Sequence, residues 1–221
     1  MSIYRHPSPS SNNTYFVSSS MSRVYPDQTP CPSPPPPSYL TSNHESFTIW
    51  MKSLVFNMHG CAVYNSIGNI IYRVDNYNNK CGQEVYLMDV QGKIIFSLLQ
   101  KKLRLFRCWD GYKWDASCSR KQLWFRVRKH RSICLSLCDD IASSGCTYKI
   151  LRMDGKLGFK IVDADQESTL VAEFKQKQST TGIIFGNDVF TLEVVQPHVN
   201  LSLIMAFIMV YGLINNQICS R

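Results

Sequence analysis

The amino-acid sequence predicts a mainly β fold, in which an antiparallel barrel of about twelve strands closes around one buried C-terminal α-helix. Residues 201–214, LSLIMAFIMVYGLI, carry no charge and are apolar all around a helix, so this helix must lie inside protein or lipid. It would be about 21 Å long, whereas a bilayer core is about 30 Å thick. The residues before it read as short strands and turns, and so large a sheet needs its edges closed. A barrel filled by the helix meets both requirements.

The first 45 residues differ from the rest of the chain. Every proline except Pro197 lies there, together with a CPSPPPPS stretch and no glycine. Such a segment has too little apolar surface to offset the entropy that folding would cost. We therefore predict a disordered Pro/Ser-rich tail over 1–45 and one folded domain over 46–221.

The domain begins with FTIWMKSLVF, which is rich in β-branched and aromatic residues and reads as a strand. An internal repeat follows, because VYNSIGNIIYRV (63–74) and VYLMDVQGKIIFSL (85–98) share one pattern. Each repeat reads as a β-hairpin in which Gly68 or Gly92 supplies the positive φ of the turn. Two similar hairpins in succession are typical of an up-and-down sheet.

Alternation and turn signals predict the remaining strands. In KQLWFRVR (121–128), Leu123, Phe125 and Val127 would face one side, and Trp124, Arg126 and Arg128 the other. Asp154-Gly155 predicts a further hairpin turn, and 169–177 and 188–195 read as strands separated by TTG and FGN turns. Pro197 suits the start of a helix over about 198–216. We expect this core helix to bury the following large side chains: Leu203, Ile204, Phe207, Ile208 and Val210.

Several segments together resemble the plant LURP-one-related family. They are FTIWMKSLVFNMHGCAVYNSIGNIIYRVDNY, YLMDVQGKIIFSLLQKKLRLF with Trp109 after it, and VAEF followed by GNDVFTLEVV and the apolar helix. The resemblance covers about 47–216 and implies the tubby C-terminal-like fold, a twelve-stranded barrel around a central helix. It implies a plant protein linked to defence or stress responses, without catalytic residues. Tubby proteins bind phosphoinositides and scramblases act at membranes, but a shared fold is only an analogy for function.

No catalytic or metal-binding pattern stands out in the sequence. There is no Gly-x-Ser-x-Gly elbow and no phosphate-binding glycine loop, and Asp139-Asp140 and the Asp163–Asp165 pair read as turns. The nine cysteines form no C-x-x-C pair, so we expect free thiols in a reducing compartment rather than a zinc site. The N-terminus lacks the apolar core of a signal peptide. We expect an intracellular protein that is not secreted. It would be cytoplasmic or peripheral to a membrane, with the nucleus as an alternative. We also expect that it is not an enzyme and needs no cofactor.

The positive charge is concentrated in one segment. The formal net charge is +8, and residues 93–131 hold twelve lysines and arginines but only Asp110 and Asp115 as acids. Outward-facing bases on neighbouring strands would form a patch suited to phosphate groups. The candidate anion- or lipid-binding residues are Lys101, Lys102, Arg104, Arg107, Trp124, Arg126, Arg128 and Lys129. The alternative is a solvated basic face that serves solubility.

Three functions remain open at this stage. The first is a non-catalytic monomer whose basic barrel face docks either on an anionic membrane that contains phosphoinositides or on an acidic protein. The second is a scramblase-like membrane protein with the C-terminal helix in lipid. The third is a tubby-like nuclear regulator, but no helix is left to enter a DNA groove, so we expect no nucleic-acid partner.

Overall fold

The computed structural model describes residues 40–41, 44–51, 59–76, 84–102, 107–115, 120–138, 145–153, 157–166, 169–179, 181–182 and 184–215. These residues form twelve strands and one helix. The elements are β1 (Glu45–Trp50), β2 (His59–Tyr64), β3 (Ile70–Asn76), β4 (Glu84–Met88), β5 (Ile94–Lys102), β6 (Arg107–Asp115), β7 (Arg120–Lys129), β8 (Ile133–Leu137), β9 (Tyr148–Arg152), β10 (Gly158–Asp163), β11 (Leu170–Gln176), β12 (Val189–Val194) and α2 (Leu201–Ile214).

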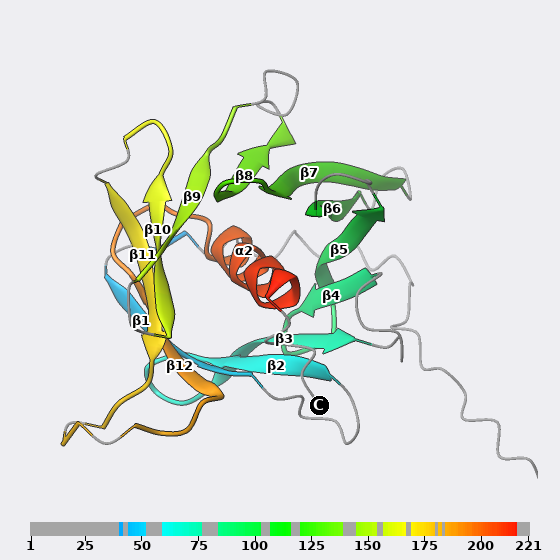
Figure 1. Cartoon of the computed structure of the whole chain (residues 1–221). Coiled ribbons are helices and arrows are strands. Elements are labelled where there is room, and N and C mark those ends of the chain that lie inside the picture. Colours follow the sequence, from blue (N-terminus) through cyan, green and yellow to red (C-terminus); the bar gives the residue numbers. More distant parts are fainter. Residues whose placement is uncertain are drawn as a thin grey trace, which may run out of the picture.

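The strands form one closed up-and-down barrel. Each strand pairs with its neighbours in sequence, and β1 closes the ring by pairing with both β2 and β12. Connections therefore alternate between two ends. We call the end with the β2–β3, β4–β5, β6–β7, β8–β9 and β10–β11 connections the Gly68 end. The other end, which carries the β5–β6, β7–β8, β9–β10 and β11–β12 connections, is the Gly182 end. Figure 1 shows the strands curving around a single central helix.

Helix α2 fills the barrel. All its residues from Leu201 to Ile214 are buried, including the five side chains expected to form its core contacts. The Asn200 side chain accepts a hydrogen bond from the Leu203 amide and so caps the helix, while Asn215 follows its last turn. The predicted fold class is confirmed, with a helix slightly shorter than the expected 198–216. Within the described part of the chain, no helix combines the length and apolarity that crossing a bilayer requires.

The two repeated hairpins have the same turn. The Asn65 side chain accepts from the Asn69 amide at 2.8 Å, and the Asp89 side chain accepts from the Lys93 amide at 2.9 Å. Gly68 and Gly92 have φ values of 85° and 84°. The internal repeat in the sequence thus corresponds to two turns of identical construction at the Gly68 end.

A residue before the predicted domain start at 46 packs against the barrel. Thr41 is buried, its hydroxyl donates to the Gln196 carbonyl at 3.0 Å, and it accepts from the Val199 amide at 3.1 Å. These bonds hold the chain against the segment that leads into α2. The predicted tail therefore contributes Thr41 to the barrel, while residues 1–39 lie outside the described residues.

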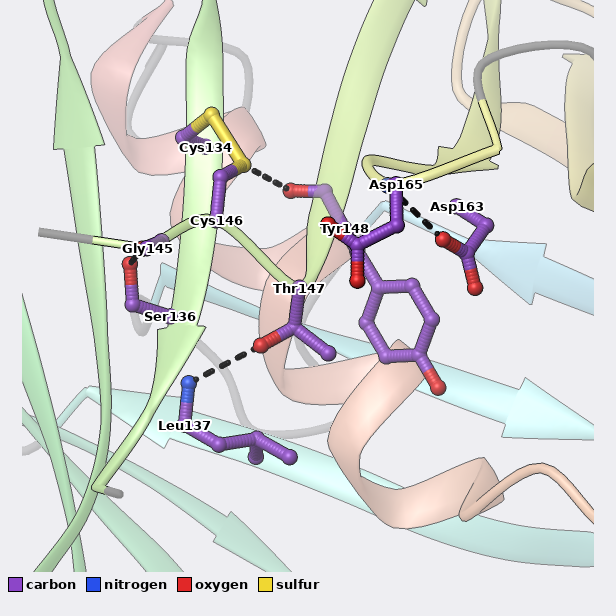
Figure 2. The surroundings of a disulfide bond; sticks show 9 residues. All are labelled: Cys134, Ser136, Leu137, Gly145, Cys146, Thr147, Tyr148, Asp163 and Asp165. Carbon is purple, nitrogen blue, oxygen red and sulfur yellow. Dashed lines mark hydrogen bonds between the residues drawn. A yellow bond between two sulfur atoms is a disulfide. The ribbon is translucent and has the colours of Figure 1, made fainter. Parts of the chain in front are cut away.

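The expectation that all cysteines are free thiols is wrong for two of them. Cys134 on β8 and Cys146, just before β9, form a disulfide with a Cα–Cα distance of 5.8 Å (Figure 2). The chain around Cys146 is also tied to β8, because the Thr147 amide donates to the Leu135 carbonyl and the Leu137 amide donates to the Thr147 hydroxyl. The described free cysteines are Cys61, Cys108 and Cys138.

Candidate anion-binding surface

Three of the predicted basic residues lie on the outer face of the barrel. Phe125 and Val127 of β7 are fully buried in the core, so the alternating Arg126 and Arg128 point outward. Lys101 of β5 is opposite Cys108 of β6, and Cys108 is opposite Arg128. These pairings place Lys101, Arg126 and Arg128 on one face of three adjacent strands.

Asp110 is the residue that joins Lys101 and Arg126, and the sequence analysis did not single it out. It lies on the same outer face of β6, opposite Leu99 of β5 and Arg126 of β7, yet only 1% of its side chain is exposed. Its burial is caused by the side chains around it. We call the set Lys101, Asp110, Arg126 and Arg128 the basic wall.

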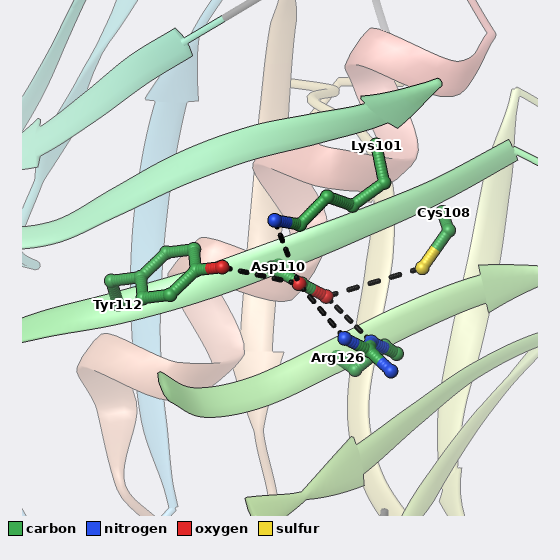
Figure 3. A network of polar contacts seen from close by, with 5 residues as sticks. All are labelled: Lys101, Cys108, Asp110, Tyr112 and Arg126. Carbon is green, nitrogen blue, oxygen red and sulfur yellow. Dashed lines mark hydrogen bonds and ion pairs between the residues drawn. The ribbon is translucent and has the colours of Figure 1, made fainter. Parts of the chain in front are cut away.

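Figure 3 shows how the side chains converge on the Asp110 carboxylate. Arg126 donates from Nε to Oδ1 at 2.6 Å and from Nη2 to Oδ2 at 2.9 Å, which is a bidentate ion pair. The Tyr112 hydroxyl donates to Oδ2 at 3.3 Å, and Lys101 Nζ lies 3.7 Å from the same oxygen. The Cys108 thiol points at Oδ1 from 4.0 Å. The carboxylate thus has partners on three strands.

These contacts favour the charged forms of Arg126 and Lys101. The hydrogen bond with Asp110 raises the pKa of Arg126. Interaction with the Tyr112 side chain, followed by the charge of Asp110, raises the pKa of Lys101. Burial raises the pKa of the Cys108 thiol, so this cysteine stays protonated and unreactive. With three cations against one carboxylate, the basic wall keeps a positive surplus.

The remaining predicted site residues do not share this face, or their side chains are not described. β7 has a bulge, because Phe125 pairs with Gly111 and Leu123 with Tyr112, which leaves Trp124 unpaired. The bulge ends the regular alternation predicted for 121–128. Lys129, next to Arg128, falls on the opposite face of the strand, across from Ile133. Lys102 and Arg107 belong to β5 and β6, but the positions of their two side chains are not described. Arg104 lies outside the described residues.

Trp124 instead packs against the core and contacts a different cation. The ammonium of Lys113 lies 4.1 Å from the centre of the Trp124 ring and 5.5 Å from that of Phe96. Desolvation by burial lowers the pKa of Lys113. The prediction that Trp124 borders the outer basic face is therefore wrong, and the bulge at this residue is the reason.

A second charged group lies on another part of the outer face. Lys175 of β11 pairs with Glu193 of β12 at 3.0 Å and with Glu173 at 3.5 Å. Glu173 and Glu193 are opposite each other in the sheet. We call these three residues the acidic wall, because Lys175 contacts both carboxylates there.

The described residues include no cluster of His, Cys, Asp and Glu that could hold a metal ion. Asp163 accepts hydrogen bonds from the amides of Asp165 and Gln166, which is the hairpin turn predicted for this segment. Asp139-Asp140 lies outside the described residues. The basic wall is therefore the candidate site.

Comparisons with known proteins agree with the fold. A sequence model of the LURP-one-related family matches residues 45–212. The chain is 39% identical to Protein LURP-one-related 11 of Arabidopsis thaliana, over 97% of this chain and 99% of that protein. It is 41% identical to Protein LURP-one-related 4 of the same plant, over 88% of this chain and 87% of that protein. An X-ray structure of an Arabidopsis thaliana protein has a TM-score of 0.59 at 15% identity, covering 81% of this chain and 96% of the other.

Proposed function

The chain belongs to the LURP-one-related family, and from this premise we propose that it is a non-catalytic plant protein whose basic wall docks on phosphoinositide headgroups of anionic membranes. A role in plant defence or stress responses is part of the same proposal. The names of these relatives describe no reaction, so the proposal rests on the geometry of the basic wall.

The observation that carries the proposal is the fixed arrangement of the bases around Asp110. Asp110 engages Nε and Nη2 of Arg126, which holds the side chain in place and leaves its other N–H groups for a ligand. Arg128 lies two residues further along β7, and Lys101 approaches the same carboxylate from β5. A guanidinium fork beside two further cations is suited to a phosphorylated headgroup.

Burial of α2 supports docking over the scramblase-like alternative. Every residue of α2 is buried inside the barrel, so inserting it in lipid would require the barrel to open and lose its core. Docking through the outer face leaves the fold intact. Each base near an anionic surface contributes about 1 kcal/mol, so a few well-placed bases give reversible binding.

The test is sedimentation of the full chain with phosphatidylcholine vesicles, with and without a phosphoinositide. We expect the Lys101→Ala/Arg128→Ala variant to bind phosphoinositide vesicles about 30-fold more weakly than the unchanged chain. The matched control is Lys93→Ala/Arg120→Ala, which removes the same charge from exposed positions at the Gly68 end and should stay within about twofold. Absence of binding by the unchanged chain overturns the proposal and directs the search to an acidic protein. An equal loss in both variants contradicts the role of the basic wall.

A further inference from the structure

The Gly182 end of the barrel exposes apolar side chains on a projecting hairpin. Ile184 and Phe185, in the connection between β11 and β12, are 52% and 51% exposed. Leu157, in the adjacent β9–β10 connection, and Trp50, at the end of β1, are exposed as well. Figure 1 shows the β11–β12 hairpin extending away from the barrel wall. Water contact at these side chains is unfavourable unless a partner covers them.

The hairpin is a built structure with paired backbone groups. The Phe185 amide donates to the Lys177 carbonyl, the Lys177 amide donates to Val189, and the Gly182 amide donates to Ser179. Gly182 and Gly186 have φ values of 79° and 89°, which glycine adopts without strain. Backbone amides that are already hydrogen-bonded enter a poorly hydrated layer at a lower cost in free energy than unbonded amides do.

One cation lies beside these apolar side chains, and further cations lie on other strands at the same end of the barrel. The ammonium of Lys177 lies 5.9 Å from the centre of the Phe185 ring. β5 and β7 run toward the same end, and Lys101 and Arg128 are the next-to-last residues of those strands. Arg131 is exposed in the β7–β8 connection at this end. Trp50, whose indole N–H donates to Asp188 at 3.0 Å, adds an aromatic residue of the kind enriched at membrane–water interfaces.

The Gly68 end has exposed apolar turn residues in a different electrostatic setting. Ile67 is 78% exposed and Val90 is 49% exposed. At this end Asp89 lies beside Val90, Asp163 and Asp165 form the β10–β11 turn, and these acids offset exposed bases such as Lys93 and Arg120. An anionic surface would repel these carboxylates. Apolar exposure alone therefore does not select a membrane-facing end, whereas its combination with cations does.

We propose that the Gly182 end faces the bilayer and that Ile184 and Phe185 insert into the headgroup–acyl boundary of an anionic membrane. The inference rests on the proposed function, which supplies the nature of the lipid. It adds the orientation of the barrel on the membrane and the side chains that insert. In this arrangement the basic wall contacts headgroups beside the hairpin, and Lys177 remains at the phosphate level while the Phe185 ring lies below it.

The experiment uses the full chain and phosphoinositide-containing phosphatidylcholine vesicles. We expect Ile184→Ser/Phe185→Ser to weaken binding at least about tenfold, because the inserted apolar area is lost. Ile67→Ser/Val90→Ser removes comparable side chains from the other end and should bind within about twofold of the unchanged chain. In a second measurement, brominated lipids should quench a tryptophan introduced as Phe185→Trp, beyond the quenching seen in the unchanged chain, and should not do so for Ile67→Trp.

The outcomes separate this inference from the proposed function. If Lys101→Ala/Arg128→Ala loses binding while the hairpin variant binds normally and Phe185→Trp is not quenched, insertion is overturned and docking stands. If the unchanged chain does not bind, both fall. If the hairpin variant changes the sedimentation coefficient of the free protein by breaking a dimer, the apolar residues serve a second copy of the chain and insertion is contradicted.

Discussion

The basic wall and the acidic wall place charge on the same barrel in different ways. The Asp110 side chain is 1% exposed, whereas the Glu173 and Glu193 side chains of the acidic wall are 21% and 29% exposed. Both groups sit on outward positions of adjacent strands. The difference is that Asp110 is covered by Tyr112, Lys101 and Arg126, and Glu173 and Glu193 remain in contact with water.

This difference teaches which charges the fold depends on. A buried carboxylate must keep its partners, because an unpaired charge away from water is costly. An exposed pair gains little, because water replaces either partner. The basic wall is therefore a fixed array of charges, and the acidic wall is an adjustable one. A ligand that needs defined geometry finds it only on the first.

The largest expected effect is on Asp110. We predict that Asp110→Ala lowers the free energy of unfolding by about 3 kcal/mol, because Arg126, whose side chain is only 26% exposed, loses its bidentate partner. Urea unfolding followed by circular dichroism measures this. Lys175→Ala is the control on the acidic wall and should cost less than about 1 kcal/mol. Similar losses in the two variants would show that the walls do not differ in the way described.

The second effect concerns the disulfide, which reinforces β8 next to the basic wall, since Cys134 is opposite Arg128. Replacing both cysteines by serine should lower the free energy of unfolding by about 2–3 kcal/mol, because the unfolded chain gains freedom. The readout is the melting temperature, which dithiothreitol should lower in the unchanged chain and leave unaltered in the variant. Cys138→Ser, which changes an exposed free thiol, is the control and should melt like the unchanged chain. A melting temperature insensitive to reduction would contradict the bond's contribution.

The sequence was sufficient for the fold because its signals are local. The uncharged run 201–214 and the two repeated turns at Gly68 and Gly92 each follow from residue type and spacing. The site was predicted less completely, because it depends on pairing between strands. A one-residue bulge moved Trp124 off the basic face, and the pairing of β6 with β7 brought Asp110 to Arg126.

The disulfide escaped prediction for the same reason. Cys134 and Cys146 are separated by 12 residues and meet only because the chain before β9 runs beside β8. Cysteine spacing carries no information on this proximity. Asp110 did leave a signal, as a single carboxylate on the outward side of a strand amid basic neighbours. A lone acid in such a segment is worth testing as the anchor of the surrounding arginines.

The most direct test of the account is a variant that changes where the charge lies but not how much there is. Lys101→Gln/Arg128→Gln/Glu173→Gln/Glu193→Gln keeps the formal net charge at +8 while it removes two positive charges from the basic wall and two negative charges from the acidic wall. We predict that its binding to phosphoinositide vesicles is at least about tenfold weaker than that of the unchanged chain, with a melting curve that shows a folded protein. Binding within about twofold of the unchanged chain would show that net charge, rather than the basic wall, holds the protein at the membrane.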